Sequence, residues 1–301
     1  MINKKNPIVS IGMPVYNSEQ SIREVLVSLM SQTYKDFELI ISDNASTDLT
    51  ESICSEYAMK DSRVKYVRQT ENIGAMDNFH FVLNEAVGRF FMFAAGDDIR
   101  TNDFIEENIK ILIKTENCVF SSSPNCYIGE EHEYIKLVSF DLKGSLYNRL
   151  SKFIDNCFLS HACFYCIART DVYKDVFANT KWDYLAGDWS INIRMLLHGE
   201  FHRAAKSRLY LGPNGVCRQP DYIKKISKGI VAKNIPFNQY TTGFLLIIIN
   251  EKRLKIFVKI VLVLKLLKFI IGFMPLIKSL IEIKNSLLGA NNLKHSNLYV
   301  F

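Results

Sequence analysis

Short apolar segments alternate with longer amphipathic segments through the first 120 residues of the chain. The apolar segments are rich in β-branched and aromatic residues, as buried parallel strands are, and cover residues 8–13, 37–42, 64–67, 90–94 and 119–123. Segments with helical periodicity separate them, at residues 18–31, 48–59, 76–86 and 102–114. This alternation predicts an α/β fold with a mainly parallel central sheet flanked by helices.

The 301 residues suffice for one such domain with an appendage. We expect residues 1–124 to form the α/β half and residues 125–220 a second half of the same domain. In that second half the alternation weakens, and the pattern predicts an inserted hairpin, a helix near residues 145–156 and a strand over residues 162–168. Residues 221–301 are expected to form a basic, apolar helical tail.

Charge is divided unevenly along the chain. Residues 1–200 contain 20 Lys and Arg against 28 Asp and Glu, whereas residues 201–301 contain 17 against 3. A basic surface of this kind favours anionic partners such as acidic lipids or nucleic acid. Nucleic acid is the weaker interpretation, because aliphatic side chains accompany these charges instead of the aromatic ones on which bases stack.

The segment from residue 243 to residue 288 is dominated by Leu, Ile, Val, Phe and Lys. It contains no uncharged window of about 20 residues, which a membrane-spanning helix requires. The pattern favours a basic amphipathic segment that lies in the membrane interface. The alternative is a helical pair that packs on the domain or mediates dimerisation.

The cysteines indicate the compartment. There are seven, an odd number, without paired metal-ligand spacing, and this usage is typical of a reducing environment. Cys163 and Cys166 have the spacing of a redox motif, but burial in a strand explains them better. The apolar run before Pro14 is too short for a signal-peptide core. We therefore expect a cytoplasmic protein, peripheral at the inner face of the cell membrane.

Two acidic stretches directly follow predicted strands. The first runs from Asp43 to Asp48 and the second from Ala95 to Asp98. The carboxyl edge of an open α/β sheet is where ligands bind, so both stretches are candidate binding loops. Asp97 and Asp98 are adjacent and repel each other, which a hard divalent cation between them, together with a bound diphosphate, would relieve.

Taken together, five segments resemble the family 2 glycosyltransferases, which have the A-type nucleotide-sugar fold. They are Val9–Asn17, Asp36–Asp48, Asn72–Gly74, Ala95–Asp98 and Gly187–Trp189, and the resemblance covers about residues 1–215. It implies an inverting, metal-dependent transfer from a nucleoside-diphosphate sugar, with UDP or dTDP favoured, to a hydroxyl of a glycan. It further implies Mg²⁺ or Mn²⁺ as cofactor and a lipid-linked acceptor, in capsule, O-antigen or lipooligosaccharide synthesis.

On this resemblance, residues 1–124 bind the nucleotide sugar, and residues 125–220 bind the acceptor and supply the catalytic base. Donor binding falls to residues of three loops, namely Pro14, Val15, Tyr16, Asn17, Asp43, Asn72 and Gly74. The aromatic ring of Tyr16 can hold a flat nucleobase, although a place in the core is its alternative. The resemblance implies that Asp43 accepts the imide hydrogen of uracil or thymine. Asp48 is expected to cap the next helix.

Ala95 stands where the family's metal motif often has an acidic residue. The resemblance therefore gives Asp97 and Asp98 the ribose and the metal between them, with Asp98 our choice for the metal. Asp188 matches the catalytic base and is expected at a helix N-cap, where backbone N–H groups stabilise a carboxylate. Asp183 is the competing acid. Ala95 also raises an alternative function, a catalytically silent, membrane-associated subunit that binds a nucleotide sugar.

Overall fold

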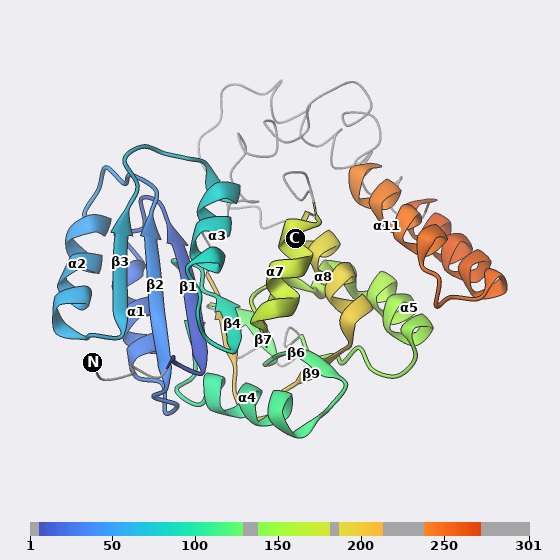
Figure 1. The fold of residues 1–301 in the computed structure, drawn as a ribbon, viewed down its shortest axis with the longest axis horizontal. Coiled ribbons are helices and arrows are strands. Elements are labelled where there is room, and N and C mark those ends of the chain that lie inside the picture. Colours follow the sequence, from blue (N-terminus) through green and yellow to red (C-terminus); the bar gives the residue numbers. More distant parts are fainter. Residues whose placement is uncertain (1–5, 129–137, 181–186, 213–237, 272–301) are drawn as a thin grey trace, which may run out of the picture.

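The computed structural model describes residues 6–128, 138–180, 187–212 and 238–271. A seven-stranded sheet lies at the centre of these residues (Figure 1), in the order β3-β2-β1-β4-β8-β6-β9. The strands are β1 (Val9–Val15), β2 (Phe37–Asp43), β3 (Val64–Arg68), β4 (Phe90–Phe93), β6 (Cys118–Ser122), β8 (Ile167–Arg169) and β9 (Glu200–Arg203). β8 is antiparallel to both of its neighbours, and the other pairs are parallel. The expected mainly parallel sheet is thus confirmed.

Helices cover both faces of the sheet, because alternate strand residues point to opposite sides. Leu39 and Ile41 of β2 belong to one buried cluster, shared with α1 (Ile22–Met30), α2 (Thr50–Lys60) and α4 (Phe104–Lys114). Ile40, between them, belongs to a second cluster with α3 (Ala75–Asn84) and the helices of the second half. Continuous apolar strands are therefore the consequence of a sheet buried on both sides.

Two expected boundaries are wrong. β1 continues through Pro14 to Val15, because its pairing with β4 ends at Gly12 and the proline lies where only β2 is paired. The strand expected over residues 162–168 begins with a short helix, α6 (His161–Phe164), and only Ile167–Arg169 is extended. A short buried apolar run has the same hydropathy in a helix as in a strand, so the pattern did not separate them.

A second, three-stranded sheet has the order β5-β10-β7. It consists of β5 (Ile99–Arg100), β10 (Leu209–Leu211) and β7 (Asn125–Tyr127). The expected hairpin appears as an antiparallel bridge between Asn125 and Val138, and the residues between 129 and 137 lie outside the described ones. This small sheet joins the loop after β4 to the second half of the domain.

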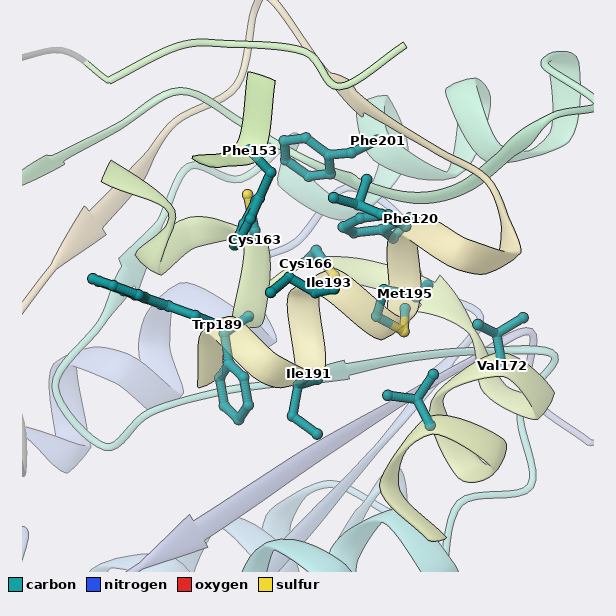
Figure 2. Close-up of a cluster of buried hydrophobic side chains, with 14 of the residues drawn as sticks. Phe120, Phe153, Cys163, Cys166, Val172, Trp189, Ile191, Ile193, Met195 and Phe201 are labelled. Atoms are coloured by element: carbon teal, nitrogen blue, oxygen red, sulfur yellow. The ribbon is translucent and has the colours of Figure 1, made fainter. Parts of the chain in front are cut away.

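The second half packs around one buried helix, α8 (Gly187–His198). Figure 2 shows Trp189, Ile191, Ile193 and Met195 of this helix among buried side chains of neighbouring elements. These elements are α5 (Leu146–Asn156), α6 and α7 (Thr170–Ala178), all of which contact α8. Because apolar side chains surround α8, its first turn is held rigidly against the domain.

The described part of the tail contains α11 (Asn238–Asn250) and a second helix over residues 256–271. Tyr240 and Phe244 of α11 and Leu262 and Leu266 of the second helix are buried in the same cluster as α8. The alternative interpretation, a helical pair that packs on the domain, is thus present up to residue 271, and the remainder of the 243–288 segment lies outside the described residues. Among the residues that the structure describes, no helix has the length and apolar character to cross a bilayer.

Candidate active site

The loops after β1 and β2 are hydrogen-bonded to each other at the carboxyl edge of the sheet. The backbone N–H of Asn17 donates to Oγ of Ser46 (2.9 Å), and the N–H of Thr47 donates to Oδ1 of Asn17 (2.9 Å). Asn17 and Ala45 have left-handed backbone angles, with φ of 48° and 60°. Such angles are uncommon outside glycine, so this pair of loops holds a specific shape.

Tyr16 lies at the outer side of this pair of loops. Its side chain is 49% exposed, so the alternative that it is a core residue is wrong. Val15 before it is buried and Pro14 is half-buried, as expected for the end of a strand. The ring of Tyr16 is therefore accessible to a flat ligand, whereas Pro14 and Val15 contribute backbone and position.

Asp43, at the end of β2, is fully buried. Its Oδ1 accepts from the Ser46 N–H (2.9 Å), and its Oδ2 accepts from the Tyr66 hydroxyl (2.8 Å). Burial and this hydrogen bond raise the pKa of Tyr66 far above its ordinary value, so the hydroxyl stays a donor. The carboxylate therefore shapes the loop, and recognition of a base by Asp43 stays a prediction.

The loop at Asn72 joins the first two loops. The Asn44 amide donates to Oδ1 of Asn72 (2.9 Å) and accepts from the N–H of Ile73 (2.8 Å). Gly74 has φ of 88°, and a Cβ there would meet no atom within 4 Å. Glycine is favoured at Gly74 by its backbone angle alone, and the space beside it is open.

Asp48 helps to begin α2, although Leu49 occupies the N-cap position. The Asp48 carboxylate accepts from the N–H of Thr50 (3.0 Å) and from the N–H of Glu19 (3.1 Å). It thus satisfies a free donor at the helix start and also ties α2 to the loop after β1. The expected contact with the helix start is thus made from the position before the N-cap.

The acidic pair after β4 is covered by Gly212, which lies 114 residues after Asp98 in the chain. Oδ1 of Asp98 accepts from the backbone N–H of Gly212 (3.0 Å), and Oδ2 has no hydrogen-bond partner among the described residues. A Cβ at Gly212 would lie 2.3 Å from Cγ of Asp97, so only glycine fits there. Asp98 is 3% exposed, and its burial raises the pKa of the carboxyl to about 6.

Arg100 is the residue that the sequence did not reveal. It is fully buried, and its Nη2 donates to the carbonyl of Phe93 (3.1 Å). Its Nε and Nη1 have no hydrogen-bond partner within the described part of the chain. The positive charge lowers the pKa of Asp98 and opposes the effect of burial. The sequence offers one signal, an arginine two residues after an acidic pair. Arginine is normally exposed, however, so its hydropathy predicts a position at the surface.

The acidic pair provides part of a binding site for a hard divalent cation. In the part of the chain that the structure describes, no three His, Cys, Asp or Glu side chains are grouped to hold a metal. A cation at Asp97 and Asp98 would therefore need further oxygen ligands from a bound molecule. Oδ2 of Asp98 is a buried carboxylate oxygen without a donor, which is the kind of ligand that Mg²⁺ and Mn²⁺ prefer.

The acidic loop also contacts the loop after β1. The hydroxyl of Ser21 donates to the carbonyl of Gly96 (2.7 Å), and a Cβ at Gly96 would lie 2.9 Å from Oγ of Ser18. Four of the five segments picked out in the sequence, those around residues 9–17, 36–48, 72–74 and 95–98, are thus joined at one edge of the sheet. This arrangement is a preformed binding edge of the kind found in α/β proteins.

Asp188 belongs to a second cluster. It is half-buried in the first turn of α8, as the second helical residue and not at the expected N-cap. The helix begins at Gly187, so the carboxylate lies inside the first turn, where free N–H groups still favour negative charge. Burial, and to a smaller extent the charge of Asp188, raises the pKa of Cys157 and Cys163 to about 12. Asp183 lies outside the described residues.

The fold agrees with the comparisons with known proteins. Residues 10–177 match the model of glycosyl transferase family 2, so the chain belongs to that family. The fold resembles S. aureus TarS in complex with UDP-GlcNAc, with a TM-score of 0.65, 20% identity, and coverage of 88% of this chain and 73% of that one. It also resembles the mannosyltransferase PcManGT of Pyrobaculum calidifontis in complex with GDP-Man and Mn²⁺, with a TM-score of 0.54, 16% identity, and coverage of 96% and 82%.

Two curated relatives match part of the chain. An uncharacterised glycosyltransferase of Haemophilus influenzae is 31% identical over 137 residues, which are 46% of this chain and 54% of that protein. The putative teichuronic acid biosynthesis glycosyltransferase TuaG of Bacillus subtilis is 33% identical over 115 residues, or 38% and 45%. The chain thus spans about half the length, or less, of these relatives.

Proposed function

We propose that the protein is an inverting, metal-dependent glycosyltransferase that moves a sugar from a nucleoside diphosphate to a hydroxyl of a surface glycan. One observation carries the proposal: loops from three strands are joined at one sheet edge around an acidic pair with an unsatisfied buried carboxylate oxygen. That edge suits a charged ligand brought in with its own cation. The proposed donor is a UDP- or dTDP-sugar, because an accessible Tyr16 ring and the adjoining loops suit a flat pyrimidine.

The acidic pair would hold the donor's diphosphate through Mg²⁺ or Mn²⁺. When bound, the cation neutralises the diphosphate so that it leaves without a proton. Asp98 presents Oδ2 for this purpose and is kept in place by the N–H of Gly212. Asp97, beside it, is half-buried, and we propose that it contacts the ribose or shares the cation.

Asp188 is the proposed base. An inverting transfer needs a carboxylate that takes the acceptor's proton as its hydroxyl attacks the anomeric carbon. The first turn of α8 stabilises the ionised carboxylate, and the packing around Trp189 fixes its position. The second half of the domain is therefore proposed to bind the acceptor. We propose a lipid-linked acceptor because a basic, apolar tail packs directly on this half.

The first experiment is a thermal-shift screen of nucleoside diphosphates with and without Mn²⁺. A ligand that binds the folded protein raises its apparent stability by mass action. We expect a metal-dependent shift with a pyrimidine nucleotide. No shift with any nucleotide would contradict the proposed donor site.

The second experiment tests the base. Asp188→Asn should keep donor binding and lose transfer by about 10²- to 10⁴-fold in single-turnover assays. Asp171→Asn is the matched control, because Asp171 likewise lies in the first turn of a helix, α7. Transfer by the Asp188 variant at the parent rate would place the base elsewhere, with Asp183 the next to test.

The alternative, a silent nucleotide-sugar-binding subunit, is favoured only by Ala95 in the acidic loop. Incubation with a panel of donors and Mn²⁺ separates the two functions. A transferase slowly hydrolyses its donor in the absence of acceptor, whereas a silent binding subunit protects it.

A further inference from the structure

The outward side of the tail helix over residues 256–271 is apolar. Six large hydrophobic side chains on it are exposed, and they recur at helical spacing: Ile256, Phe257, Ile260, Leu264, Leu267 and Ile271. We name this set the outer face. Ile256 is 74% exposed and Phe257 71%. A helix packed on a soluble domain normally turns polar residues to water, so this face is unusual.

The opposite side of the same helix is already occupied. Leu262 and Leu266 are buried in the cluster around α8, and the ring of Phe269 lies 5.5 Å from that of Phe158. Lys265 is paired with Asp155 of α5 (2.5 Å). The apolar character of the outer face is therefore not needed for packing against the described domain.

Three lysines near the outer face have ammonium groups that make no hydrogen bond or ion pair to any described residue. Lys252 and Lys255 precede the helix, and Lys268 lies on it, beside Leu267. All three are exposed. An exposed apolar stripe accompanied by free lysines is the combination that inserts into the headgroup region of an anionic bilayer.

We propose that the outer face docks on an anionic lipid surface. Charge complementarity favours lipid over the other occupants. A symmetric pair of chains through this face would bring the same lysines together, and like charges repel. Residues 272–301 contain three lysines and one glutamate, so covering by this segment would leave the lysines unneutralised.

Docking would also orient the domain. The ring of Tyr240 in α11 lies 5.1 Å from that of Trp189, the residue after Asp188. Figure 1 shows the tail helices at the end of the molecule away from β1, β2 and β3. The lipid-facing helix, α11 and α8 thus form one packed unit. The inference concerns this surface and does not rest on the proposed reaction.

The test is co-sedimentation of the full chain with vesicles of phosphatidylcholine, with and without phosphatidylglycerol. The triple variant Phe257→Gln, Ile260→Gln, Leu264→Gln should lower the bound fraction at least about tenfold, because each side chain gives up apolar burial in the lipid. The matched control is Met59→Gln with Ile113→Gln, two exposed apolar residues on α2 and α4. The control should bind as the parent chain does.

The lysines are tested separately. Lys252→Gln, Lys255→Gln and Lys268→Gln together should weaken binding to phosphatidylglycerol vesicles and reduce its dependence on salt. A second measurement uses Phe257→Trp, whose fluorescence brominated lipids should quench, whereas Met59→Trp should not be quenched. This readout remains informative if the triple variant misfolds.

Three results would overturn the proposal. The first is a parent chain that does not bind anionic vesicles, and the second is a triple variant that binds them as well as the parent does. The third is a parent chain that is dimeric by light scattering without lipid and becomes monomeric in the triple variant. That result would assign the outer face to a second copy of the chain.

Discussion

Replacing Asp98 with Asn should remove a pH dependence of stability that the fold builds in. The carboxyl is buried, accepts one hydrogen bond from Gly212, and has a pKa raised from 3.8 to about 6. The folded protein therefore holds this proton more tightly than the unfolded chain. The stabilisation from this proton is complete below about pH 4 and is lost as the pH rises through about 6.

The size of the effect follows from the pKa difference. A pKa raised from 3.8 to about 6 corresponds to about 3 kcal/mol between the two ends of the window. Asparagine keeps an oxygen for the Gly212 N–H and has no proton to lose. Between acid and neutral pH, the free energy of unfolding of the variant should therefore rise by up to about 3 kcal/mol relative to that of the parent. A difference between the two proteins that is the same at every pH does not affect this change.

The assay is urea unfolding followed by circular dichroism at several pH values between 4 and 7.5, without divalent metal. As the pH rises, the free energy of unfolding of the parent should fall relative to that of the variant. A parallel pair of curves would refute the reasoning, since it would mean that the carboxyl titrates alike in both states. With Mn²⁺ and a nucleotide present, the parent should instead gain stability that the variant does not.

Three further predictions concern single side chains. Gly212→Ala places a Cβ against Asp97 and should abolish the metal-dependent thermal shift with nucleotide, whereas Gly74→Ala, in open space, should only strain its loop. Tyr66→Phe removes the hydroxyl that donates to Asp43 and should cost about 1.5–3 kcal/mol in urea unfolding; an unchanged midpoint would show that the hydrogen bond is dispensable. Tyr240→Ala should cost about 3–5 kcal/mol, because the ring is fully buried against Trp189, and a cost under about 1 kcal/mol would contradict packing of the tail on α8.

Much of the α/β half follows from local pattern. Strands buried on both faces must be apolar throughout, and the helices between them must carry an apolar stripe, so both leave a periodic signal. The pattern therefore predicts that the loops after β1, β2 and β4 lie at one edge of the sheet. The hydrogen bonds of Asn17 with Ser46 and of Ser21 with Gly96 show that these loops meet.

Elements whose conformation depends on partners were predicted less well. Residues 162–164 are apolar and buried, yet they belong to a helix where a strand was expected. Asp188 lies within the first turn of α8 because the helix begins at Gly187, two residues before the start that an N-cap at Asp188 implies. Boundaries of this kind are set by packing and capping contacts that a single sequence does not contain.

The sequence by itself determined the alternating architecture, the candidate loops and the basic, apolar character of the tail, because each is a property of neighbouring residues. Only the tertiary structure decided which groups meet. Gly212 donates to Asp98 across 114 residues, and Arg100, two residues after the acidic pair, is buried although its side chain suits a surface. The fold also divided the tail into one side packed on α8 and one exposed side, since burial depends on contacts between residues distant in the chain.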